Sequence, residues 1–371
     1  MRRVTMKKKV LAVLSVSLAM TFLLGACGGS AKPQTEAPAS QGAAAGGSTE
    51  AEAPSGDKIV MKISHVSSPG SARDLGCQKL AEVVEEMTGG RVEAQIYPSS
   101  QLGGQRDQVE GAQFGTIECV VVPTSYLGGT CPMMTLLDTP YLLPDDPEQL
   151  YELYQSDAIK SLRDTTTEKG ILTMAIWQTG YKVWSANKPL LDPADMKGLK
   201  VRVMNSPILF KQAEVLGATG ITMDFGETYG ALQNKALDGQ ENPIDTIYDM
   251  KFHEVQTDIT KTNHSGLDQV VLINKAWYDG LDADIQEAIT QGVKQGGRVC
   301  LEETLALAEK DEKLIADTGK TAIHELDDEQ KAAWRTAMVP VQEYARTSQG
   351  AEGEKIYDAI VAARKEITGE Q

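Results

Sequence analysis

Residues 198–256 read GLKVRVMNSPILFKQAEVLGATGITMDFGETYGALQNKALDGQENPIDTIYDMKFHEVQ, and this stretch decides the fold class. Lys200 to Met204 predicts a strand, and Pro207 to Leu216 predicts a helix. Asn205 or Ser206 suits the N-cap of that helix, with proline in its first turn. A strand that leads directly into a helix is the building unit of an α/β protein.

The same alternation runs outward along the chain. Further strands are expected at 59–65, 91–97, 119–122, 171–177, 182–186, 220–224 and 268–273, and helices at 74–87, 105–114, 148–162, 228–235 and 282–316. The opening strand–helix–strand order implies a parallel sheet covered by helices. About 315 residues of this pattern suggest two α/β lobes, and the helix at 282–316 is long enough to cross between them. Ligands of such sheets bind where the carboxyl ends of strands meet helix N-termini.

The first 56 residues read as export and anchoring signals. Five Lys and Arg side chains precede the apolar run Val10–Leu24, which is too short to span a membrane. The small residues before Cys27 are typical of a lipoprotein signal over 1–26, with the lipid on Cys27; an ordinary signal with a chance cysteine is the alternative. Residues 28–56 contain no large apolar side chain and predict a flexible tether over 27–56, with a reach of roughly 30 Å.

The net charge of the chain limits the kinds of molecule that it is expected to bind. The chain carries a net charge of −16; residues 1–26 contribute +5 and residues 27–56 contribute −2, so the remainder carries −19. Such an acidic body is not expected to bind nucleic acid, because neutralising phosphates requires clustered Lys and Arg. It would also repel anionic lipid, so the membrane contact depends on Cys27. An anionic ligand must be held by local positive charge in a cleft.

Motifs for catalysis or metal binding are not found in the sequence. None of the four histidines stands in a zinc-helix spacing, and no G-x-S-x-G, Walker loop, G-x-G-x-x-G or C-x-x-C occurs. We therefore expect no enzyme activity, no cofactor and no metal. Four cysteines lie in the body, and bridges or free thiols are equally open for them: Cys77, Cys119, Cys131 and Cys300.

Arg202 is the first candidate for ligand binding. If Val201 and Val203 enter the core, the arginine points to the other face of its strand. It then stands beside a helix N-terminus, where free N–H groups attract anions, and its guanidinium can bind a carboxylate through two hydrogen bonds. The alternative is a structural ion pair with Asp224 or Glu241.

Two further residues of this stretch, Asn242 and Phe225, are also candidates for ligand binding. The run Asp238–Pro243 predicts a turn, in which Asn242 could contact a ligand or bond its own backbone. Phe225 follows the strand at 220–224, and its alternative is simple core packing.

These motifs resemble the solute receptors of tripartite ATP-independent periplasmic (TRAP) transporters, the DctP-like family. The resemblance covers about residues 59–366 and rests on 97–103, 198–203, 238–243, 251–256, Asn263-His264 and Asp268-Gln269.

The resemblance implies a two-lobed, periplasmic-binding-protein-like fold that closes on a ligand between its lobes. Lobe I would hold residues 57–179 and 268–307, and lobe II residues 180–267 and 308–371. It further implies membrane permease subunits as partners, and ligand contacts from lobe II side chains: Arg202, Asn242, Asn205, Ser206 and Phe225.

One position departs from the sialic-acid receptors of this family. They carry Gly-x-Arg where this chain has Gly180-Tyr181-Lys182, which disfavours sialic acid. Lysine lacks the planar fork of arginine but can still hold an acid, so Lys182 is a ligand candidate, with a solvated lysine as the alternative. Lobe I is expected to add further contacts at strand ends and loops: His65, Gln105, Ser125 and Tyr126.

The sequence therefore predicts an exported, lipid-anchored receptor that faces the periplasm or the exterior. It would deliver a small organic acid (a C4-dicarboxylate, sugar acid or keto acid) to a TRAP permease. A receptor that signals to a sensor kinase is the alternative, and an exported enzyme is a third class.

Overall fold

The computed structural model describes residues 58–370. They belong to one compact unit, Ala53–Gln371. The expected signal peptide, Cys27 and the tether lie outside the described residues. In the described part of the chain, no helix is long and apolar enough to cross a membrane.

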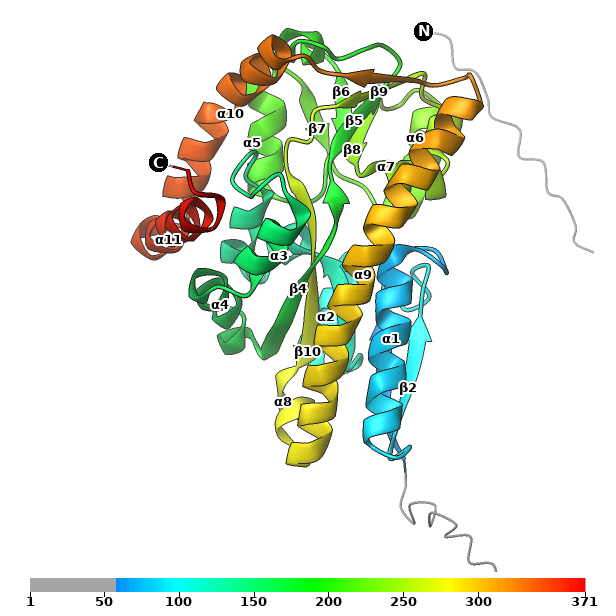
Figure 1. Cartoon of the computed structure of the whole chain (residues 1–371), viewed down its shortest axis with the longest axis vertical. Coiled ribbons are helices and arrows are strands. Elements are labelled where there is room, and N and C mark those ends of the chain that lie inside the picture. Colours follow the sequence, from blue (N-terminus) through cyan, green and yellow to red (C-terminus); the bar gives the residue numbers. More distant parts are fainter. Residues whose placement is uncertain (1–57, 371) are drawn as a thin grey trace, which may run out of the picture. The chain divides into compact units, whose positions relative to one another are not determined.

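Two β-sheets organise this unit (Figure 1). The first has the order β2-β1-β3-β10-β4, in which β10 runs antiparallel to both of its neighbours. The second has the order β11-β9-β5-β8-β6-β7. The strands are β1 Ile59–Ser64, β2 Val92–Tyr97, β3 Cys119–Pro123, β4 Ile171–Tyr181, β5 Val183–Ala186, β6 Lys200–Arg202, β7 Thr219–Ile221, β8 Gly239–Asn242, β9 Asp258–Lys261, β10 Gly266–Asn274 and β11 Ala322–Glu325.

Helices cover both sheets. They are α1 Ala72–Met87, α2 Gln105–Phe114, α3 Pro147–Tyr154, α4 Asp157–Asp164, α5 Pro207–Val215, α6 Thr228–Gln233, α7 Ile244–Asp249, α8 Lys275–Asp279, α9 Ala283–Asp317, α10 Asp328–Ser348 and α11 Gly350–Thr368. Short 3-10 turns lie at η1 Thr124–Leu127, η2 Pro132–Asp138, η3 Thr167–Lys169, η4 Pro193–Met196, η5 Phe225–Glu227 and η6 Phe252–Glu254. The two-lobed α/β architecture expected from the sequence is confirmed.

Two of the predicted elements are wrong. The run Asp238–Pro243 is not a turn, because Gly239–Asn242 forms the strand β8 between β5 and β6. The single helix expected at 148–162 is broken after Tyr154, where the hydroxyl of Ser156 caps the N-terminus of α4. The four cysteines of the described body are free and buried.

The chain passes between the sheets at two adjacent points. β4 belongs to the first sheet and β5 to the second, and only Lys182 separates them. β9 and β10 are joined in the same way by residues 262–265. The backbone of Lys182 bonds both Ser265 and His264 across the gap. The two connections therefore lie side by side, and the long helix α9 is a third link (Figure 1).

Helix α9 has 35 residues and is about 50 Å long. It packs on helix α1, on strand β4 of the first sheet and on helix α7 near the second sheet. Small residues bring α9 close to α1, and the indole of Trp177 donates a hydrogen bond to the carbonyl of Val293 at 3.1 Å. A Cβ on Gly296 would lie 2.6 Å from the carbonyl of Gly76 and 3.0 Å from the ring of Trp177.

We therefore expect Gly296→Ala to destabilise the protein. Overpacking costs about 1–3 kcal/mol, against a gain of up to about 1 kcal/mol in helix propensity. Urea unfolding measures the difference. Gly230→Ala in α6 is the matched control, because a Cβ there meets no atom within 4 Å. Equal unfolding midpoints for the two variants would contradict the close packing.

Candidate functional site

Arg202 ends β6 inside the second sheet and is 1% exposed. Its Nη2 donates to the hydroxyl of Tyr126 at 2.8 Å, and its guanidinium lies 5.5 Å from the ring centre of Phe225. The ion pairs considered with Asp224 or Glu241 are not among its contacts in the described residues, and its Nε has no hydrogen-bond partner. A buried guanidinium with an unused donor is an incomplete site, because buried charges are normally paired.

The helix that follows begins as expected. Ser206 is the N-cap of α5 and Pro207 occupies its first turn. Ser206 is fully buried, whereas Asn205 is exposed. The sequence allowed either Asn205 or Ser206 as the N-cap of this helix, and the structure shows that it is Ser206.

Asn242 ends β8, next to the crossing from β4 to β5. Its Nδ2 donates to the side-chain oxygen of Gln240 at 2.5 Å. It lines a small cavity of about 20 Å³, which has room for about one water molecule. The cavity is lined by Val66, Ser67, Arg73, Gln105, Pro123, Met204, Phe225, Asn242, Thr246 and Leu267.

A larger cavity of about 310 Å³ adjoins the small one. Both are lined by Ser67, Arg73, Phe225 and Thr246. Arg202 lines neither cavity, but its guanidinium contacts the ring of Phe225, which lines both. We centre the site on the small cavity because Gln105 near the first sheet and Asn242 of the second meet there, and we treat the larger cavity as its continuation.

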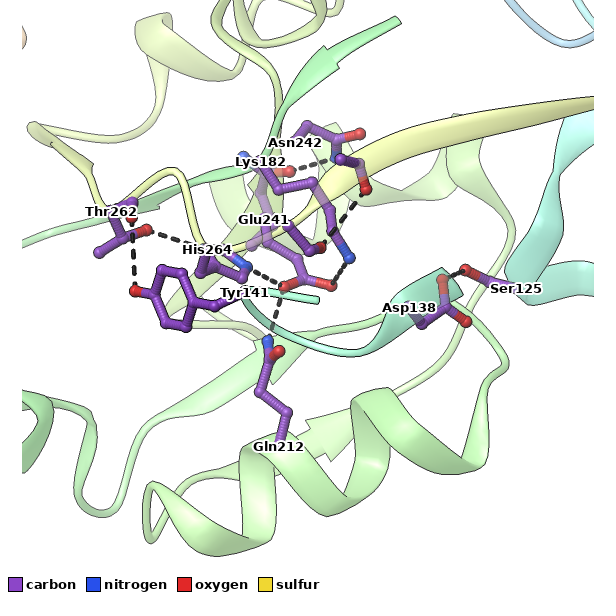
Figure 2. Close-up of polar contacts among 12 residues, drawn as sticks. Ser125, Asp138, Tyr141, Lys182, Gln212, Glu241, Asn242, Thr262 and His264 are labelled. Carbon is purple, nitrogen blue, oxygen red and sulfur yellow. Dashed lines mark hydrogen bonds and ion pairs between the residues drawn. The ribbon is translucent and has the colours of Figure 1, made fainter. Parts of the chain in front are cut away.

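Lys182 is fully buried and turns toward Glu241, whose Oε1 accepts from its Nζ at 3.2 Å. Figure 2 shows that His264 and Gln212 also converge on this carboxylate, at 2.7 and 2.8 Å. Lys182 and His264 lie in the two crossings between the sheets. The network that they form with Glu241 and Gln212 therefore lies at these crossings. Lys182 lines neither cavity.

This network carries charge at neutral pH. Burial alone would raise the pKa of Glu241, but Lys182 and His264 outweigh it and lower that pKa to about 2. Burial lowers the pKa of His264, so its ring is neutral. The carboxylate can only accept, so Nε2 of His264 carries the proton, and Nδ1 accepts from the hydroxyl of Thr262 at 2.8 Å.

The four candidates that the sequence places in lobe I divide into two groups. Gln105 lines the small cavity and Tyr126 bonds Arg202. His65 and Ser125 are fully buried and bond acidic side chains instead: His65 lies 3.1 Å from Asp74, and Ser125 donates to Asp138 at 2.6 Å. Burial raises the pKa of Asp138, and the positive charge of Lys182 lowers it by a smaller amount.

Arg73 was missed in the sequence. It lies in the first turn of α1, is 6% exposed and lines both cavities. A signal was available, because a cation at a helix N-terminus opposes the helix dipole and needs a reason to be there. In the described residues, no group of three or more His, Cys, Asp or Glu side chains could hold a metal ion.

Two α/β sheets joined by paired crossings form a two-lobed fold, in which Arg202 of the second sheet contacts Tyr126, just after β3 of the first sheet, and keeps an unused donor among the described residues. The family model of bacterial extracellular solute-binding protein, family 7 (DctP), matches residues 63–348, and this chain belongs to that family. It is accordingly an extracytoplasmic solute-binding protein rather than an enzyme.

Relatives support this assignment over most of the chain. The C4-dicarboxylate-binding periplasmic protein DctP of Rhodobacter capsulatus is 34% identical over 319 residues, which cover 85% of this chain and 92% of the relative. A TRAP periplasmic solute-binding protein from Desulfovibrio salexigens, with bound orotic acid, is 37% identical with a TM-score of 0.78. One from Shewanella oneidensis, with bound succinate, is 29% identical with the same TM-score. Each of these structures is covered completely and covers 83% of this chain.

Proposed function

We propose that this protein is the receptor of a TRAP-type secondary transporter and captures a small organic acid for a membrane permease. The observation that carries the proposal is Arg202, which is buried, has no carboxylate partner among the described residues and keeps Nε free. A guanidinium in this state suits the carboxylate of a ligand.

We assign the ligand contacts around this arginine. Arg202 would pair with the carboxylate, and Tyr126 and Phe225, which it already contacts, would hold its orientation. Asn242 and Gln105 would contact the ligand from opposite lobes, since both line the small cavity. We give the remaining candidates supporting roles. His65, Ser125 and Lys182 bond acidic side chains, Asn205 is exposed, and Ser206 is the buried N-cap of α5.

The ligand would be a C4-dicarboxylate, a sugar acid, a keto acid or another small organic acid. Support comes from the relatives, which are described as binding C4-dicarboxylates, succinate and orotic acid. Lys182 supports the exclusion of sialic acid, since its ammonium is committed to Glu241.

Delivery to the permease requires that the lobes open and close. We place the hinge at Lys182 and residues 262–265, next to the lobe boundaries proposed from the sequence at 179/180 and 267/268. A ligand favours the closed form only through contacts with both lobes. We also propose that the receptor is exported and held at the membrane by lipid on Cys27.

A thermal-shift screen of the unit Ala53–Gln371 against small acids tests this function. An acid present at 100 times its Kd should stabilise the protein by about 2.7 kcal/mol. Neutral sugars and cations of similar size serve as controls. If only these neutral or cationic compounds stabilise the protein, the carboxylate receptor is the wrong assignment.

A further inference from the structure

Arg73 is the least satisfied charged group near the site. It is 6% exposed, and within residues 58–370 its Nε and Nη1 have no hydrogen-bond partner. Its guanidinium forms no hydrogen bond or ion pair with any residue in 58–370. Burying a charge without a partner is costly, so this arginine implies an anion that the chain itself does not supply.

The acidic side chains around Arg73 do not meet this need. The carboxylate of Asp74 is already bonded by His65, the backbone N–H of Gly70 and the amide of Gln78. Asp245 lines the larger cavity with Arg73 and interacts with it electrostatically, but it lies beyond ion-pair distance. Burial raises the pKa of Asp245 to about 7, so near neutral pH it carries only part of a charge.

Arg73 also stands opposite the groups assigned to the ligand. It lines the small cavity together with Asn242 and Phe225. The guanidinium of Arg202 lies 5.5 Å from the ring centre of Phe225, which lines this same cavity. Two buried guanidiniums therefore approach the same cavity, Arg73 from α1 beside the first sheet and Arg202 from the second sheet through Phe225.

We propose that Arg73 is the second anion anchor of this site, so that the ligand carries an acidic group at each end and bridges Arg73 and Arg202. This inference rests on the proposed receptor function. It makes Arg73 the residue that selects diacids over monoacids of the same size, and it gives the ligand one charged contact in each lobe.

Calorimetry with succinate and with its monoamide, succinamate, tests the selection. The two probes have nearly the same shape and differ in one charge. We expect the unaltered protein to prefer succinate, and Arg73→Met to weaken succinate binding by at least about 30-fold while it changes succinamate binding by less than about threefold. Arg106→Met is the matched control, because Arg106 is an exposed arginine of α2 paired with Glu110, and it should bind both probes as the unaltered protein does.

The melting temperature of the ligand-free protein gives a second readout that needs no ligand. An anchor held without a partner destabilises the empty protein, so Arg73→Met should melt at least about 2 °C higher. A structural arginine would give the opposite shift, and a lower melting temperature would overturn the inference whether or not succinate binds.

The receptor function and the second anchor can fail separately. If no acid binds the unaltered protein, the receptor function fails. If succinate binds the unaltered protein and Arg73→Met equally well, only the second anchor is wrong.

Discussion

Replacing Arg202 by alanine should weaken binding of the acid ligand by at least about 2 kcal/mol, roughly 30-fold in Kd. The change removes a charge-assisted pair from a site where the guanidinium is 1% exposed. It also leaves the hydroxyl of Tyr126 without its partner at 2.8 Å. The loss should appear in the dissociation rate more than in the association rate, because the pair forms only inside the cleft.

Isothermal calorimetry with the acid found by thermal shift measures this effect. Arg202→Lys keeps the charge but loses the planar fork, so it should recover only part of the affinity. Lys200→Ala, an exposed neighbour on the same strand, is the matched control and should bind normally. Near-unaltered affinity in Arg202→Ala would remove the arginine from the site.

Replacing Lys182 by methionine should destabilise the protein by about 3–5 kcal/mol, the largest stability effect that we expect. The change leaves the carboxylate of Glu241 buried with only neutral partners, His264 and Gln212. The double variant Lys182→Met/Glu241→Gln removes both charges and should recover most of the loss.

Urea unfolding across pH separates the two possible roles of Lys182. With the pKa of Glu241 lowered to about 2, the stability from its charged form is complete above its ordinary pKa and is lost as the pH falls toward 2. The difference between the unaltered protein and Lys182→Met should therefore shrink over this acid range. A variant with normal stability but lost acid binding would instead make Lys182 a ligand contact.

The spacing of apolar residues predicted most of the fold, because this spacing reflects which side chains of a helix or strand are buried. The helix at Gln105–Phe114 is found at its predicted bounds, and β1 differs from its prediction by one residue. Strand β8 was missed because its side chains are polar and flanked by Gly239 and Pro243. Most of their partners come from elsewhere in the fold, as when Gln240 donates to Ser185 at 2.9 Å.

Site candidates could be predicted from the sequence where local chemistry decides, and their roles stay predictions; contacts that depend on distant partners could not be predicted. Arg202 stands out in the sequence because a capped helix start follows it closely. The partner of Lys182 lies far along the chain in Glu241, so no pattern could assign that pair. The role proposed for Arg73 rests on its lack of a partner among residues 58–370, which can be seen only once its neighbours are in place.

Helix α9 has a mechanical consequence. It is a rod fixed against α1 at one end and against α7 at the other. The crossings at Lys182 and 262–265, where we propose the hinge, are short, whereas α9 is a continuous helix and resists bending. Any rotation of one sheet relative to the other must therefore flex this rod or slide it along one of its two contacts. With the proposed hinge, the stiffness of α9 would add to the work that a ligand must do when it changes the angle between the lobes.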